Sequence, residues 1–118
     1  MTKNRPTLEN LINANTTEVE IFQNSVLRPI IKMQHDLIIA FFESYLKKRK
    51  IVFTSLSEEK KKNIIKSSME KDISFKNKII GSVLGHFSMD EYQNYTQNSS
   101  EFNRRIKQII IKRLQDSI

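Results

Sequence analysis

The stretch Leu27–Phe42, LRPIIKMQHDLIIAFF, decides the fold. Its apolar residues recur at intervals of three and four, which is the spacing of an α-helix and not the alternation of a strand. On a helix that turns by about 100° per residue, these residues cover well over half of the circumference, far more than the ~100° stripe of an ordinary surface helix. Such a helix needs cover on most sides. We therefore expect it to be the central helix of a bundle or to face a second subunit.

Helix start signals recur along the rest of the chain. Thr17–Glu20 and Ser88–Glu91 have the spacing of a capping box, in which a hydroxyl and a carboxyl satisfy free backbone N–H groups. Ser55 or Ser57 can cap a further helix. Asp72 can cap a separate segment, unless the preceding helix runs through it. These signals predict several helices joined by short connections.

The predicted fold is all-α: a single helical domain over residues 1–118, built as a compact bundle of about four to six helices. A short amphipathic segment is expected at Pro6–Asn13, a long central helix over about residues 18–52, and a last helix starting at Asn98 or Ser99. Pro29 lies inside the long helix, where proline removes a backbone donor and crowds the preceding turn. We therefore predict that the long helix is kinked near Pro29.

Composition supports this class and narrows the functions open to the protein. A chain of 118 residues with only two Gly has too few turn-formers for an all-β fold or a glycine-rich nucleotide loop. It has no Cys, so thiolate metal ligands and disulfides are excluded. The N-terminal residues show no apolar signal core, and no run approaches ~18 apolar residues. We expect a soluble cytoplasmic protein with no membrane contact, no metal and no cofactor.

The formal charge of +7 makes this a basic protein and suggests an anionic partner. The best basic face lies on the last helix and combines Arg104, Arg105 and Lys112. Arg113 falls among apolar positions instead, where it should snorkel or pair with a carboxylate. Lys nevertheless outnumbers Arg by more than two to one, whereas proteins that read phosphate or bases use Arg forks. Nucleic-acid association is possible on this basis but is not favoured.

Two polar residues stand where the long helix should be apolar. Gln34 projects from the middle of the apolar arc, and His35 lies at its edge. The first interpretation is a hydrogen-bonded pair inside the core or across a subunit interface, because an unpaired buried amide costs about 1–3 kcal/mol. The second is a polar pocket that gathers Gln34 and His35 with Lys76, His86 and Tyr92, where a histidine could move a proton.

The chain's two glycines, Gly81 and Gly85, share one face of a predicted helix. Each costs up to ~1 kcal/mol relative to alanine in a helix. We expect them to allow the close approach of a neighbouring helix. The alternative is that they leave room for a ligand.

Four segments in order, FQNSVLRPIIKMQHDL, KDISFKNKIIGSVLGHF, EYQNY and NRRI, resemble a group of short bacterial helical proteins that are often automatically labelled "glyoxalase". The resemblance spans about Thr7 to Ile118 and carries over no catalytic residue. Known glyoxalase chemistries use metal ligands on strands, a His-rich cluster or a nucleophilic Cys. The chain has no such pattern, only two His and no Cys.

The function favoured by these patterns is a homodimeric structural or interaction module, because a wide apolar arc needs cover. A protein partner is also possible. The alternatives are a small-ligand-binding protein or enzyme, and a weak nucleic-acid-associated protein. An enzyme is the less favoured of these classes, because the residues show no catalytic constellation.

Overall fold

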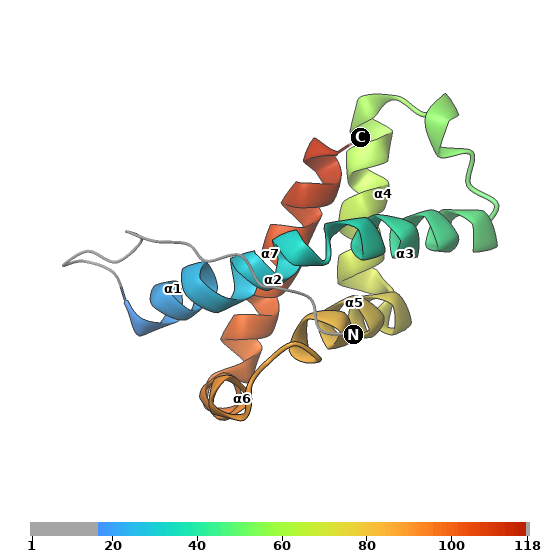
Figure 1. Ribbon diagram of the computed structural model, residues 1–118. Helices are drawn as coiled ribbons and strands as arrows, with labels where there is room; N and C mark the ends of the chain where they lie inside the picture. Colours follow the sequence, from blue (N-terminus) through green and yellow to red (C-terminus); the bar gives the residue numbers. More distant parts are fainter. Residues whose placement is uncertain (1–16, 118) are drawn as a thin grey trace.

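The computed structural model describes residues 17–117, which form helices joined by short connections and contain no strand (Figure 1). This confirms the predicted all-α class and compact bundle. The segment Pro6–Asn13 lies outside the described residues. The elements, in order, are α1 Glu18–Phe22, the π-helix η1 Gln23–Leu27, α2 Arg28–Met33, α3 His35–Lys48, the 3₁₀ turn η2 Phe53–Ser55, α4 Glu58–Lys71, α5 Ile73–Leu84, α6 Met89–Thr96 and α7 Ser99–Asp116.

The run from α1 to α3 crosses in front of two steeply inclined helices, α7 and α4 (Figure 1). Helix α7 packs against η1, α4, α5 and α6, and α3 packs against α5. The molecule measures 45 × 32 × 25 Å along its principal axes. Helix α7 therefore takes part in most of these helix–helix contacts.

Side-chain caps explain where the helices begin. The hydroxyl oxygens of Thr17 and Ser57 accept backbone N–H groups at the starts of α1 and α4, and Ser88 heads a complete capping box on α6. Asp72 separates α4 from α5, because its Oδ1 accepts the backbone N–H of Phe75 at 3.0 Å. Of the two alternatives for Asp72, the separate segment is the one observed.

The kink predicted at Pro29 is not shown by the structure. The turn before it is a π-turn, in which the Arg28 N–H donates to the Gln23 carbonyl five residues back. Pro29 then stands in the first turn of α2, where a missing N–H is harmless. The helix is interrupted instead at Gln34, whose φ of −93° and ψ of 10° separate α2 from α3.

Helix α3 ends at Lys48, before the predicted boundary near residue 52. Lys50 adopts the left-handed conformation, with a φ of 57°. The Ile51 N–H then donates to the Leu46 carbonyl at 3.0 Å, and the Lys50 N–H donates to the Lys47 carbonyl at 3.1 Å. This is a Schellman motif, which usually places Gly rather than Lys at the left-handed position.

The wide apolar arc is largely covered within one chain. Leu27, Ile30, Ile31 and Ile38 are fully buried in a core that also takes side chains from α4, α5 and α7. Leu37 is the exception, with 37% of its surface exposed. The central position predicted for this helix therefore rests on contacts inside the chain.

The glycines of α5 do not serve close helix packing. A Cβ built on Gly81 would meet nothing within 4 Å, and one on Gly85 would meet only the Gly81 carbonyl at 3.4 Å. The prediction that these glycines allow a neighbouring helix to approach closely is therefore wrong. Both residues are exposed.

Candidate functional site: a basic groove between α2 and α7

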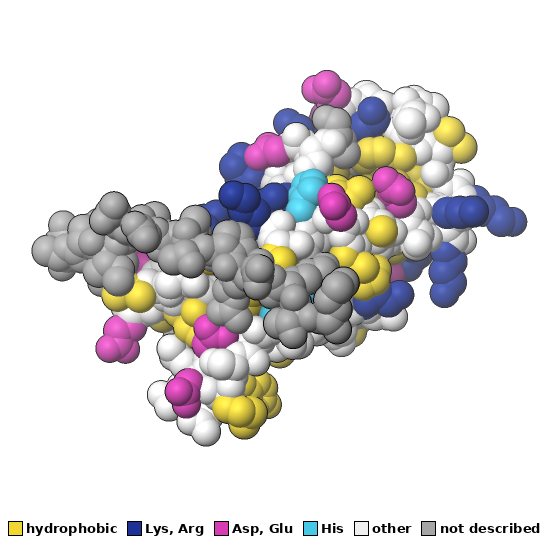
Figure 2. Space-filling model, in the orientation of Figure 1, with side chains coloured by type: hydrophobic (Ala, Val, Ile, Leu, Met, Phe, Trp, Pro, Cys, Tyr) yellow, Lys and Arg dark blue, Asp and Glu magenta, His cyan; other side chains and the backbone are white. Residues whose placement is uncertain are grey.

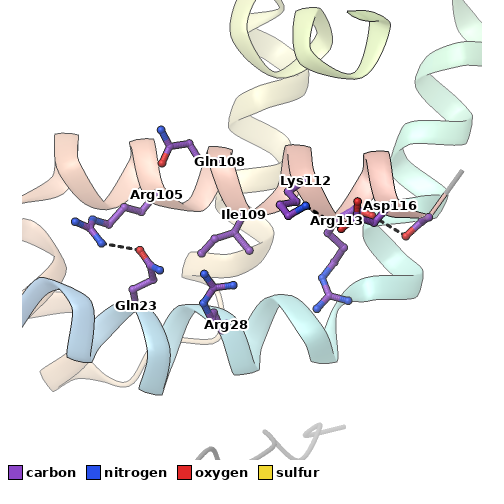
Figure 3. Close-up of a pocket in the computed structure, with 9 residues that line it drawn as sticks. Gln23, Arg28, Arg105, Gln108, Ile109, Lys112, Arg113 and Asp116 are labelled. Atoms are coloured by element: carbon purple, nitrogen blue, oxygen red, sulfur yellow. Dashed lines mark hydrogen bonds and ion pairs between the residues drawn. The ribbon is translucent and has the colours of Figure 1, made fainter. Parts of the chain in front are cut away.

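A groove of about 470 Å³ lies between the run from η1 to α2 on one side and α7 on the other (Figure 3). We call it the basic groove. Its lining includes Gln23 and Arg28 from the first side and, from α7, Arg105, Gln108, Ile109, Lys112, Arg113 and Asp116.

The helical repeat of α7 places these side chains together. The buried face of α7 carries Phe102, Ile106, Ile110 and Leu114 at intervals of four. The groove residues follow a neighbouring stripe, from Arg105 to Asp116. Arg105 and Arg113 are eight residues apart, which is about 12 Å along the helix axis. The cations are therefore spread along the groove.

Arg105 ties the two walls together. Its NH1 donates to Oε1 of Gln23 at 2.7 Å, and its Nε donates to Oε1 of Glu101 at 2.8 Å. Glu101 also accepts from Nε of Arg104 at 3.1 Å. The hydrogen bonds from Arg104 and then Arg105 lower the pKa of Glu101 from 4.5 to about 2, and Glu101 in turn raises the pKa of Arg104.

The Glu101 cluster gives a testable pH dependence. The folded-state pKa is depressed, so its stabilisation is fully present above pH 4.5 and is lost as the pH falls through about 2. An NMR titration should find the Glu101 carboxyl midpoint near 2. In Arg104→Gln/Arg105→Gln the midpoint should rise toward 4.5. A wild-type midpoint already at the ordinary value would contradict this assignment.

Arg28 and Arg113 differ from Arg105 because their partners are neutral. Nε of Arg28 donates to Oδ1 of Asn24 at 3.1 Å. NH1 of Arg113 lies 3.3 Å from Nδ1 of His35, and since a guanidinium only donates, this nitrogen accepts. Within residues 17–117, no carboxylate forms an ion pair with either guanidinium. Their positive charge is available to a ligand.

Lys112 and Asp116 form an ion pair, so together they add little to the net charge of the groove. Nζ of Lys112 lies 3.4 Å from Oδ2 of Asp116, and both side chains are largely exposed. Surface pairs of this kind contribute about 0–1 kcal/mol and exchange readily with solvent. A stronger anion could therefore replace Asp116 beside Lys112.

The five residues of the predicted polar pocket have different surroundings. Gln34 is buried, with 4% of its surface exposed, and its Nε2 donates to the Ser82 carbonyl at 3.4 Å. His35 contacts Arg113 at the edge of the basic groove. The contact to Ser82 agrees with the core interpretation of Gln34, in which the amide is hydrogen-bonded inside the bundle.

The other three candidates lie toward α5 and α6. Lys76 lines a second cavity of about 520 Å³ between α5 and α7. His86 is half-buried in the turn after α5, and Tyr92 is exposed on α6, where it stacks against Tyr95 at 6.2 Å.

The predicted basic face divides between two cavities. Arg105 and Lys112 line the basic groove, whereas Arg104 lies with Lys76 in the α5–α7 cavity. Arg28, which was not among the residues predicted for a site, also lines the groove. Arg113 was expected to snorkel or to pair with a carboxylate; among the described residues its contact is to the His35 imidazole.

Within the described residues, no three His, Asp or Glu side chains gather in a way that could hold a metal ion. No helix among residues 17–117 has both the length and the apolar character needed to cross a bilayer. The polar groups that line the basic groove are mainly cations and amides.

Comparison with known proteins finds no matching family model, no matching curated protein and no matching solved structure. The resemblance to helical proteins labelled "glyoxalase" stays a prediction, and the function has to be argued from the groove itself.

Proposed function

We propose that the protein is a helical interaction module that binds an acidic segment of a partner protein in the basic groove. The observation that carries this proposal is the pair Arg28 and Arg113. Both guanidiniums line the groove, and their described contacts are to a neutral amide and an imidazole. Carboxylates bind guanidinium forks by paired, charge-assisted hydrogen bonds, which are about twice as strong as neutral ones.

The shape of the groove favours a polypeptide segment. Its cations extend over about 12 Å along α7, which suits several carboxylates in a row better than one small anion. Ile109 supplies apolar surface in the middle, and Gln23 and Gln108 add amides that can bond a peptide backbone. Among residues 17–117, no aromatic side chain lines the groove, whereas sites for single-stranded nucleic acid usually stack bases on aromatics.

Removal of the two available guanidiniums tests the proposal. A fluorescently labelled peptide rich in Asp and Glu should bind the wild type, and Arg28→Gln/Arg113→Gln should weaken binding about tenfold or more, because two charge-assisted contacts are lost. Fluorescence anisotropy measures the affinity. The control, Lys47→Gln/Lys60→Gln, removes two exposed cations outside the groove and should change affinity by less than about twofold.

Equal weakening by both double variants would refute a specific groove and leave only attraction to net charge. A labelled single-stranded oligonucleotide, assayed in parallel, separates the nucleic-acid alternative. If it binds through Arg28 and Arg113 more tightly than the peptide and persists at ~0.15 M salt, the partner is a nucleic acid.

The proposed homodimer has a smaller apolar surface than the sequence suggested. On α3, Leu37 is 37% exposed, Ala40 is exposed and Phe41 is half-buried. Association through this strip would give a native mass of about twice 13.9 kDa, and Leu37→Glu would return it to one chain. Sedimentation equilibrium at micromolar concentration measures this. A wild type with the mass of one chain would exclude the dimer.

A further inference from the structure

A third cavity, of about 460 Å³, lies between α3 and α5 and shares no lining residue with the basic groove. Its volume falls in the range of about 300–1,000 Å³ that small-molecule sites occupy. Two kinds of side chain dominate its lining: the aromatic rings of Phe41, Tyr45 and Phe75, and the cations of Lys48, Arg49 and Lys78.

The two helices present these groups in register. Residues 41, 45, 48 and 49 follow one stripe of α3, and residues 75 and 78 lie one turn apart on α5. Phe75 is buried and forms the floor, with its ring centre 4.7 Å from that of Tyr45. Phe41 and Tyr45 are both half-buried and line the cavity, so part of each ring faces its interior.

The cations already occupy ring faces. The guanidinium carbon of Arg49 lies 4.6 Å from the ring centre of Tyr45, and Nζ of Lys78 lies 5.8 Å from that of Phe41. Arg49 is held in place by an ion pair with Asp72, the residue that caps α5. Lys78 has no such anchor among the described contacts, so it can swing away and expose the Phe41 ring.

The charge balance leaves the cavity positive. Its carboxylate, Asp72, is bonded both to Arg49 and to the Phe75 N–H. Lys48 and Lys78 lie on opposite walls and form no ion pair within the described residues. Figure 2 shows further Lys and Arg side chains at the right-hand end of the molecule, where α3 finishes.

We infer that the α3–α5 cavity binds a nucleotide unit: a flat base that stacks on the ring of Phe41 and the guanidinium of Arg49, with its phosphate between Lys48 and Lys78. An aromatic ring next to a pair of cations matches both halves of this ligand, as in sites that combine base stacking with backbone charge. The inference does not depend on the acidic partner proposed for the basic groove.

The unit can come from a free nucleotide or from a single strand, and two probes distinguish these sources. Fluorescently labelled ATP and a labelled single-stranded oligodeoxythymidine are titrated with the full chain, and anisotropy measures binding. Binding of labelled ATP identifies a free nucleotide, and binding of the oligonucleotide alone identifies a single strand. Either result supports the site, and no binding of either probe overturns it.

Matched variants locate the binding. Phe41→Leu and Lys78→Gln should each weaken binding at least about fivefold, because they remove the stacking ring and a phosphate contact. The controls Phe53→Leu and Lys61→Gln alter another cation–π pair, 5.6 Å apart, which does not line this cavity, and they should leave affinity within about twofold. Circular dichroism confirms that each variant is folded.

Three results would overturn the inference. The first is equal weakening by the variants and their controls. The second is displacement of labelled ATP by inorganic pyrophosphate as effectively as by ATP, since the base would then contribute nothing. The third is loss of binding only in Arg28→Gln/Arg113→Gln, which would place the nucleotide in the basic groove.

Discussion

Phe102→Ala is expected to lower the free energy of unfolding by about 3–5 kcal/mol, the largest effect of any substitution considered for this protein. Phe102 is 2% exposed, and its ring centre lies 4.5 Å from that of Phe22 and 6.2 Å from that of Tyr95. The loss combines buried apolar area with the cavity that alanine would leave. Thermal unfolding followed by circular dichroism should show a fall in Tm of roughly 10 °C or more.

Phe102→Ala should also loosen the packing between the two walls of the basic groove. The Phe22–Phe102 contact lies next to the hydrogen bond between Gln23 and Arg105, so the two interactions together hold the end of α1 and the start of η1 against α7. Tyr92→Ala is the control, because this aromatic residue is 46% exposed and its loss should cost less than about 1 kcal/mol. A Phe102→Ala protein as stable as Tyr92→Ala would show that the described helix crossing is wrong.

Gln34→Leu is expected to cost about 1–3 kcal/mol, although it replaces a polar residue in the core by an apolar one of similar size. The Gln34 amide donates to the Ser82 carbonyl near the end of α5. That carbonyl lacks its usual helical donor, because the His86 N–H bonds to Val83 instead. A backbone acceptor cannot be removed by substitution, so this partly buried carbonyl would remain without the Gln34 donor.

Chemical denaturation of Gln34→Leu measures this cost, and the slope of the unfolding transition should stay unchanged. Gln93→Leu on α6 is the matched control: Gln93 is exposed, and the change should lie within about 0.5 kcal/mol. An increase in stability in Gln34→Leu would contradict the hydrogen bond to Ser82. Unchanged stability with loss of a binding activity would favour the ligand-site interpretation.

Local chemistry made most of the fold predictable. Caps at Thr17, Ser57 and Ser88 act within one helical turn, so the sequence around them predicts where α1, α4 and α6 begin. The helix class followed from the spacing of apolar residues. Gln34 was also visible as an anomaly, and the structure buries it at the break between α2 and α3.

The site was only partly predictable, because it depends on which helices cross. Arg105 and Lys112 stand out on α7, but the partner wall that carries Arg28 is 77 positions away in the chain, from 105 back to 28. Arg28 is exposed on its own helix, so the periodicity of that helix alone could not show that α7 lies opposite. Likewise, Gln34 and Lys76 were grouped in one predicted polar pocket, but Gln34 donates to the Ser82 carbonyl and Lys76 lines the α5–α7 cavity.

The π-turn of η1 determines the helical phase of everything that precedes it. In a regular α-helix, residues five apart point about 140° away from each other, so Gln23 and Arg28 would not line one groove. The wider turn, with its Arg28 N–H to Gln23 carbonyl bond, brings both to the same side. Deleting one residue from this turn would leave these two positions four apart in an ordinary helix, which keeps nearly the same phase. Deleting one residue from the regular turns of α2 would instead rotate η1 and α1 by about 100° relative to α3 and take Phe22 away from Phe102. The π-turn should therefore tolerate the loss of one residue better than the regular turns of α2, where a deletion should be far more damaging than a substitution of an exposed side chain.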